Sequence, residues 1–142
     1  MKNLLTALLV VLCYTCTSAQ PFSIGHRSFT VTDPSRSRQI PLELYYPADV
    51  AGNNVSFAQQ APSAPIVVFG HGFVMTWDAY ANIWQSLVPA GYIVAFPTTE
   101  GSFAPSHLEF GKDLAFSVTA IQAEGQTPSS VLYGHEIGRA HV

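Results

Sequence analysis

Cysteine is absent after residue 16, and charged side chains are scarce. Both cysteines, Cys13 and Cys16, lie in a stretch typical of a signal peptide, so we expect a mature chain without disulfides. Lipoprotein acylation at Cys16 is disfavoured, because Cys13 and Thr15 stand where leucine and a small residue are expected. Charged residues are 11% of the chain and unclustered, which argues against nucleic acid or an anionic membrane as a partner.

The first residues predict export. Lys2 precedes an apolar run, Leu4 to Leu12, that is too short to span a bilayer. Thr17 and Ala19 occupy the minus-three and minus-one positions of a cleavage site before Gln20. We therefore expect residues 1–19 to be a signal peptide, cut between Ala19 and Gln20, and the mature protein to be secreted or periplasmic. No later apolar run has the length of a transmembrane helix, so we expect no transmembrane segment.

The next part of the chain predicts a hairpin and then a buried strand. His26 to Thr32 and Gln39 to Tyr46 are rich in β-branched and aromatic residues, and turn-forming residues 33–35 separate them. Such a short link favours antiparallel pairing. Residues 48–65 have the composition of a loop, and Ile66 to Phe69 is an uninterrupted apolar run, as expected of a parallel strand covered on both faces.

Helices and strands then alternate. Residues 76–88 carry an apolar stripe at helical spacing, and Pro89 and Gly91 end it; Tyr92 to Pro97 is a second buried strand. Ser106 to Glu109 is a capping box that begins a helix with four apolar residues on one face: Phe110, Leu114, Val118 and Ile121. A third short strand is predicted at 130–133. This order predicts an α/β fold, an N-terminal antiparallel hairpin followed by parallel strands with flanking helices and right-handed crossovers.

Two loops at the carboxyl ends of the predicted parallel strands hold the candidate site. In the first, Gly70 to Phe73 ("GHGF"), the glycines permit a sharp turn that leaves the Phe73 N–H free to face a developing negative charge. The alternative is a plain strand-to-helix turn in which His71 only packs. In the second, Gly134, His135 and Gly138 fit the G-x-S-x-G elbow of a nucleophile, but Glu136 stands in place of the serine.

From about residue 25 to residue 135, the chain resembles the N-terminal half of a secreted α/β-hydrolase. The resemblance is carried by four segments in the same order: "RSRQIPLELYYPA" (36–48), "PIVVFGHGF" (65–73), "LVPAGYIVAFP" (87–97) and "VLYGH" (131–135). The branch it is most similar to contains chlorophyllase-like proteins, platelet-activating-factor acetylhydrolases, dienelactone-hydrolase-like proteins and cutinase-like polyesterases. We therefore expect residues 20–135 to be the N-terminal half of an α/β-hydrolase domain.

The resemblance implies hydrolysis of a carboxylic ester by a Ser-His-Asp triad, without a cofactor. No metal site is expected, because none of four histidines stands at a metal-ligand spacing with another: His26, His71, His107 and His135. The Phe73 N–H would be one oxyanion donor and the N–H of Ile137 the other, while His71 and Gly72 would shape the loop. Phe73 and Trp77 would line an acyl pocket, or else pack in the core. Small-molecule esters, lipids and polyesters are the expected substrates. The sequence predicts no oligomeric state, and a non-catalytic binding protein of the same fold is the alternative function.

The C-terminal residues depart from the family pattern. In this fold the acid and the histidine of the triad follow the nucleophile, but only six residues follow Glu136, and His141 is too close to it to be the base. Glu136 could be a carboxylate nucleophile or mark a pseudo-enzyme. We favour a third explanation, because "EIGRAHV" (136–142) is the translation of a widely used sequencing-library adapter that ends at a stop codon. We therefore expect 136–142 to be a non-native tail, and the chain to be an inactive fragment that aggregates or is degraded.

Overall fold

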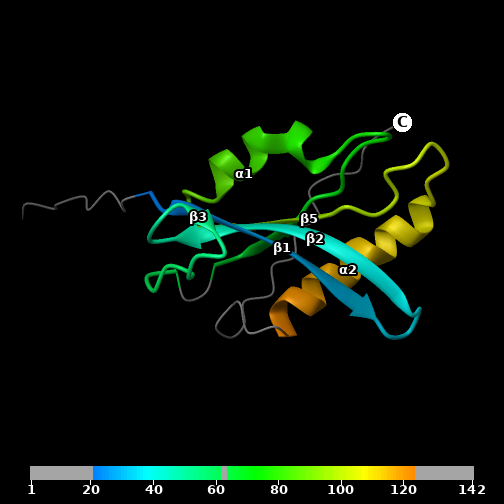
Figure 1. The fold of residues 1–142 in the computed structure, drawn as a ribbon, viewed down its shortest axis with the longest axis horizontal. Helices are drawn as coiled ribbons and strands as arrows, with labels where there is room; N and C mark the ends of the chain where they lie inside the picture. The colour runs from blue at the N-terminus through cyan, green and yellow to red at the C-terminus, as the bar shows by residue number, and fades with distance from the viewer. Residues whose placement is uncertain (1–20, 62–63, 124–142) are drawn as a thin grey trace, which may run out of the picture.

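A computed structural model of the chain describes residues 21–61 and 64–123 (Figure 1). The predicted hairpin is confirmed and is longer at both ends than predicted. β1 (Ser23–Asp33) pairs with β2 (Arg38–Ala48) in antiparallel register from Ser23 opposite Ala48 to Asp33 opposite Arg38. The Asp33 carboxylate caps the turn, since it accepts hydrogen bonds from the Ser35 N–H at 2.9 Å and the Ser35 hydroxyl at 2.6 Å. The predicted signal peptide, third strand and nucleophile elbow lie outside the described residues.

The predicted loop at 48–65 contains a short strand, which corrects the sequence-based expectation. β3 (Gly52–Asn53) pairs in parallel with β1, Gly52 opposite Gly25 and Asn53 opposite His26. An isolated bridge joins Ala48 to Phe57. A two-residue strand has no side-chain period of its own, so its pairing is fixed by β1 and leaves no pattern in the sequence.

β4 (Ile66–Val68) and β5 (Ile93–Pro97) form the predicted parallel pair, and β5 also pairs antiparallel with β2. The sheet order is β3-β1-β2-β5-β4. β4 ends one residue before the predicted boundary at Phe69, although the Phe69 N–H still donates to the Ala95 carbonyl at 2.8 Å. The hairpin, the parallel pair and the helices on both faces are consistent with the N-terminal part of an α/β-hydrolase sheet.

The helix predicted at 76–88 begins as a 3₁₀ turn, η1 (Trp77–Tyr80), and continues as α1 (Ala81–Leu87). The Thr76 hydroxyl donates to the Asp78 carboxylate, and no side chain caps the backbone N–H groups of the first turn. The chain then leaves the helix as predicted, since Gly91 has a φ of 96° and its N–H donates to the Val88 carbonyl at 2.9 Å.

α2 (His107–Ala123) forms half of its predicted capping box. The Ser106 hydroxyl accepts the Glu109 N–H at 3.2 Å, but the Glu109 carboxylate accepts hydrogen bonds from Arg36 and Lys112 instead of from the Ser106 N–H. That N–H donates to Glu100 from the loop before the helix. No helix in the described part of the chain has the length and apolar composition required to cross a membrane.

The two helices cover opposite faces of the sheet (Figure 1). Residues alternate between the faces along β5, so Ile93 and Ala95 pack in the cluster beneath α2, whereas Val94 and Phe96 pack in the cluster beneath α1. All four side chains are fully buried. This two-sided burial explains why β5 reads as a continuous apolar run.

Candidate active site

The Gly70–Phe73 loop directly follows β4, and side chains pack closely against both of its glycines. A Cβ at Gly70 would lie 3.2 Å from a ring carbon of Phe110 in α2. A Cβ at Gly72 would lie 3.0 Å from the Tyr80 hydroxyl oxygen, which accepts the Gly72 N–H at 2.8 Å. The loop is therefore held between α2 and η1, at the carboxyl end of a parallel strand, where this class of sheet places its chemistry.

His71 is buried and is bonded to the loop that follows β5. Its Nε2 lies 2.8 Å from the Thr99 carbonyl oxygen and its Nδ1 lies 3.0 Å from the Gly72 carbonyl oxygen, and the ring packs on Phe110 at 4.7 Å between centroids. A neutral imidazole has one N–H, and the shorter contact favours donation from Nε2 to Thr99. His71 therefore joins the loops after β4 and β5, and its role in shaping an oxyanion loop stays a prediction.

Phe73 points outward at the tip of the loop. Phe73 is 59% exposed, and its backbone N–H has no hydrogen-bond acceptor within residues 21–61 and 64–123. The Met75 N–H donates to the Gly72 carbonyl at 3.1 Å, which closes a β-turn around Phe73 and Val74. This geometry leaves the Phe73 N–H available to an anionic oxygen.

Val74 has a φ of 54°, in the left-handed region that β-branched residues rarely occupy. Such a conformation costs on the order of 1 to 3 kcal/mol and is concentrated at functional sites. The strain lies directly after the Phe73 N–H, in a loop that both neighbouring elements fix. The left-handed conformation of Val74 therefore indicates that this loop has a function beyond reversing the direction of the chain.

Trp77 was predicted to line an acyl pocket or to pack in the core. Its ring centroid lies 5.8 Å from that of Tyr45 and 6.1 Å from that of His26, within the cluster beneath α1. These contacts favour the packing interpretation, and the role of Trp77 in a pocket stays a prediction. The predicted elbow residues Gly134, His135 and Glu136 lie outside the described residues.

The sequence analysis missed a network of charged residues, whose centre is Asp113 in α2. The Asp113 side chain is 0% exposed and accepts hydrogen bonds from Arg36 Nη2 at 2.7 Å, Arg38 Nη2 at 2.7 Å and the Thr99 hydroxyl at 2.7 Å. Arg38 also binds Glu100 at 2.7 Å. Burial by itself would raise the pKa of Asp113, but the hydrogen bonds from Arg38, Thr99 and Arg36 outweigh it and lower that pKa, so the carboxylate is charged.

The network also corrects the predicted face of α2. Its fully buried positions are Asp113, Ser117 and Ile121, so the line of deepest burial includes two polar residues that the apolar stripe left out. The Ser117 hydroxyl donates to the Asp113 backbone carbonyl at 2.6 Å, which satisfies it within the helix. The two arginines of the hairpin, Arg36 in the turn and Arg38 at the start of β2, were the sequence signal of a buried acidic partner.

A second polar cluster contains the residue types of a triad in the wrong arrangement. His26 Nε2 lies 2.6 Å from Glu43 Oε2, and the Ser28 hydroxyl donates to the same oxygen at 2.6 Å. A nucleophilic serine needs the histidine between itself and the acid, because the histidine takes its proton. Here the glutamate stands between the other two, so this cluster stabilises the hairpin and does not activate Ser28.

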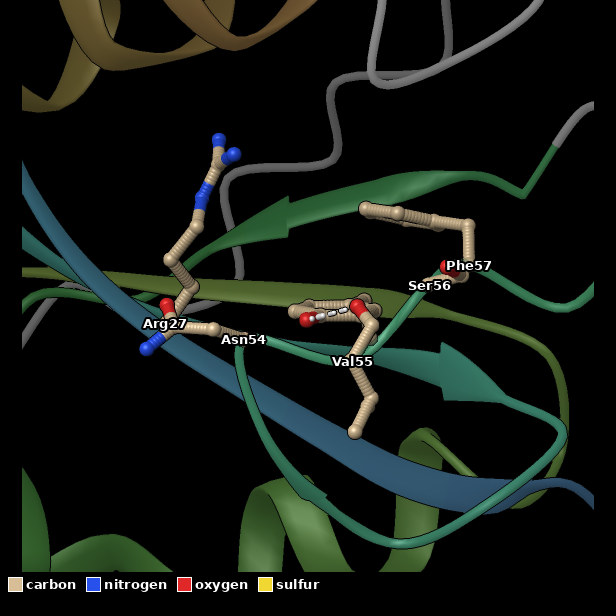
Figure 2. A pocket seen from close by; sticks show the side chains of 6 residues that line it. Arg27, Asn54, Val55, Ser56 and Phe57 are labelled. Atoms are coloured by element: carbon tan, nitrogen blue, oxygen red, sulfur yellow. Dashed lines mark hydrogen bonds between the residues drawn. The ribbon is translucent and has the colours of Figure 1, made fainter.

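A surface hollow of about 490 Å³ lies at the opposite part of the sheet and is lined by side chains from β1, β2 and the segment after β3: Arg27, Tyr46, Asn54, Val55, Ser56 and Phe57 (Figure 2). The Tyr46 hydroxyl donates to the Val55 carbonyl at 2.6 Å, drawn as the dashed line in Figure 2, and the rings of Tyr46 and Phe57 stack at 4.1 Å. None of the predicted site residues lines it. In the described ranges, no three His, Cys, Asp or Glu side chains are grouped to hold a metal ion.

Comparison with known proteins gives a fold-level likeness only. No protein-family description matches the chain, and no curated protein matches it. Among solved structures, it is similar to a ferulic acid esterase from Streptomyces cinnamoneus, with 20% identity, a TM-score of 0.47, and coverage of 57% of this chain and 34% of that one. It is also similar to S-formylglutathione hydrolase from Staphylococcus aureus, with 16% identity, a TM-score of 0.47, and coverage of 72% and 44%. The chain thus spans less than half the length of either protein.

Proposed function

We propose that the chain is the N-terminal part of a serine hydrolase that cleaves carboxylic esters. The observation that carries this proposal is the Phe73 N–H, which has no acceptor in the described ranges and lies at the tip of a strained loop after β4. Backbone N–H groups in such a position stabilise the oxyanion that forms when a nucleophile attacks an ester carbonyl.

The remaining parts of the mechanism lie outside the described residues. We propose that the natural residue at position 136 is a serine, that the N–H of the next residue is the second oxyanion donor, and that an acid and a histidine further along the natural chain complete the triad. The protein is proposed to be exported by residues 1–19, and residues 136–142 are proposed to be non-native.

The substrate class follows from the surface beside the loop. Phe73, Val74 and Met75 are 59%, 43% and 41% exposed, so three consecutive apolar side chains surround the proposed oxyanion donor. An apolar surface there favours the acyl or alcohol part of a hydrophobic ester over a charged substrate. Lipid, polyester and small-molecule esters all satisfy this requirement.

The first test removes the proposed donor from the full-length gene product. Phe73→Pro lacks the backbone N–H, and we expect kcat for a short acyl ester to fall by about 10² to 10³ with little change in KM. Phe73→Ala retains the N–H and serves as the matched control, so it should alter KM more than kcat. Equal kcat values for the two variants would show that this N–H does not bind the oxyanion.

The second test is the gene sequence across the codons for Val131 to Val142 and beyond. A serine codon at 136 and an open frame with a later Asp and His support the hydrolase, and a fluorophosphonate probe should then label that serine. A genomic glutamate codon followed by a stop would favour the alternative, a non-catalytic binding protein of the same fold.

A further inference from the structure

A continuous chain of hydrogen bonds runs from helix α2 to the Gly70–Phe73 loop. The Thr99 hydroxyl donates to Asp113 Oδ2 at 2.7 Å, and the Thr99 backbone carbonyl accepts from His71 Nε2 at 2.8 Å. His71 lies between Gly70 and Gly72 in this loop. Thr99 is thus bonded to the loop through its backbone carbonyl and to the buried Asp113 carboxylate through its hydroxyl.

The carboxylate is itself fixed in place. Arg38 binds it through both Nε and Nη2, at 2.9 and 2.7 Å, and Arg36 binds its other oxygen at 2.7 Å. Four donor groups from three other segments thus hold the Asp113 carboxylate, and one of them, the Thr99 hydroxyl, connects it to the loop after β5.

We propose that Asp113 and Thr99 are positioning residues for the oxyanion loop: through Thr99 and His71, Asp113 holds the loop backbone in the conformation that exposes the Phe73 N–H. The catalytic meaning of this inference rests on the proposed function, whereas the mechanical link does not. Neither Asp113 nor Thr99 contacts the substrate in this proposal; each acts through His71.

The mechanical link is tested by NMR hydrogen exchange in the folded full-length gene product. Two amides report on the loop, the Gly72 N–H bonded to Tyr80 and the Met75 N–H bonded to Gly72. Thr99→Val removes the hydroxyl at nearly constant volume, and we expect both amides to exchange about tenfold faster, since one hydrogen bond to a charged group is lost. Thr99→Ser retains the hydroxyl and should restore the slow exchange.

Thr98→Val is the matched control, because the Thr98 hydroxyl makes one long contact of 3.4 Å to the Pro41 carbonyl and none to Asp113. It should leave both amides unchanged. If Thr99→Val does not fold, Thr99→Ala replaces it, with the same expectation. Unchanged exchange of Gly72 and Met75 in a folded Thr99 variant that lacks the hydroxyl overturns the proposal.

Kinetics of the full-length gene product separate this inference from the proposed function. Thr99→Val should lower kcat for a short acyl ester about tenfold, with KM within about twofold, because a misplaced oxyanion donor affects the transition state more than the ground state. Thr99→Ser should rescue kcat. If the unaltered protein hydrolyses no ester, the proposed function fails, and the exchange experiment still decides whether Asp113 and Thr99 hold the loop. If Thr99→Val accelerates exchange but leaves kcat unchanged, the positioning role in catalysis is wrong.

Discussion

The cluster beneath η1 and α1 is rich in aromatic rings, whereas the cluster beneath α2 is mostly aliphatic, and α2 also carries a buried carboxylate, Asp113. Beneath α1, Tyr45 stacks on Trp84 with ring centroids 4.3 Å apart and planes 2° apart, and Phe96 meets Tyr45 edge-on at 6.2 Å. Burial raises the pKa of Tyr45 to about 12, so this ring is neutral at ordinary pH. Ring and aliphatic packing dominate this face, and its hydrogen bonds, from the Gly72 N–H to Tyr80 and between His26 and Glu43, lie at its margins, where the side chains are partly exposed.

The α2 face adds directional bonds to hydrophobic burial. Ile40, Leu42 and Ile121 are fully buried there, and Asp113 is as deeply buried as they are. Apolar packing tolerates changes of shape at similar volume, but a buried ion pair does not tolerate the loss of one charge. Both faces contact the candidate loop, through Tyr80 and through His71, but only the α2 face connects it to a buried network of charged residues.

The largest expected effect comes from an isosteric change on the α2 face, which is compared with a conservative apolar change on the α1 face. Asp113→Asn removes the charge but not the volume, and we expect the free energy of unfolding to fall by about 3 kcal/mol, because Arg36 and Arg38 lose their shared partner. Phe96→Leu on the α1 face should cost about 1 kcal/mol. Urea denaturation of both variants, made in the full-length gene product, measures the difference. Equal losses would show that the two faces do not differ in tolerance.

A smaller effect is expected when a methyl group is added on the α2 face of the sheet. Gly25 lies opposite Tyr46 in the hairpin, and a Cβ at Gly25 would lie 2.4 Å from a ring carbon of Tyr46. Gly25→Ala should therefore destabilise the fold by about 2 kcal/mol through overpacking. Gly111→Ala in α2 is the matched control, because a Cβ there meets nothing within 4 Å, and it should stabilise the helix by up to about 1 kcal/mol. Thermal denaturation of both variants gives the sign.

Mild acid should lower the free energy of unfolding through the carboxylates of the α2 face. The expected loss is smaller than that caused by the substitutions. The pKa of Glu100 is lowered chiefly by its hydrogen bond from the Ser106 N–H, and that of Asp113 by Arg38, Thr99 and Arg36 against burial. A lowered folded-state pKa contributes stability above the unfolded-state pKa, and this contribution is lost as the pH falls through the folded-state value. At pH 4 only part of it is lost.

The measurement is urea denaturation at pH 7, 5 and 4. The free energy of unfolding should decline toward pH 4, and Asp113→Asn should show a shallower decline because it lacks the central carboxylate. Phe96→Leu is the control and should keep the slope of the unaltered protein. A slope that Asp113→Asn leaves unchanged would assign the acid sensitivity to carboxylates outside this network.

The hairpin, the parallel pair and the Ser106 cap were predictable because each has a local cause. The turn residues after Asp33, the apolar runs of β4 and β5, and the hydroxyl of Ser106 act on neighbours in the sequence. The position of the Gly70–Phe73 loop follows equally from the end of a buried strand. The sequence thus predicts where the candidate site begins.

Asp113 was not predictable from periodicity. An acidic residue in a helix is assigned to the solvent face unless its partners are known. Here the partners are Arg36 and Arg38, which lie 77 and 75 positions before Asp113 in the sequence. The bond between His71 and Thr99 likewise joins two loops 28 residues apart. Such contacts depend on the sheet order, in which β5 lies between β2 and β4, and no local pattern encodes that order.

The smallest expected effect concerns a polar atom on the aromatic face. Trp84 Nε1 is buried and has no hydrogen-bond partner in the described part of the chain, although the ring stacks on Tyr45. Trp84→Phe retains an aromatic ring for stacking and removes the unsatisfied N–H, so the lost apolar area and the relieved desolvation should cancel to within about 1 kcal/mol. Trp77→Phe on the same face loses similar area without that relief, and it should therefore be the more destabilising of the two in urea denaturation. A larger loss for Trp84→Phe than for Trp77→Phe would mean that the indole N–H has a partner, and that the α1 face also depends on a directional bond.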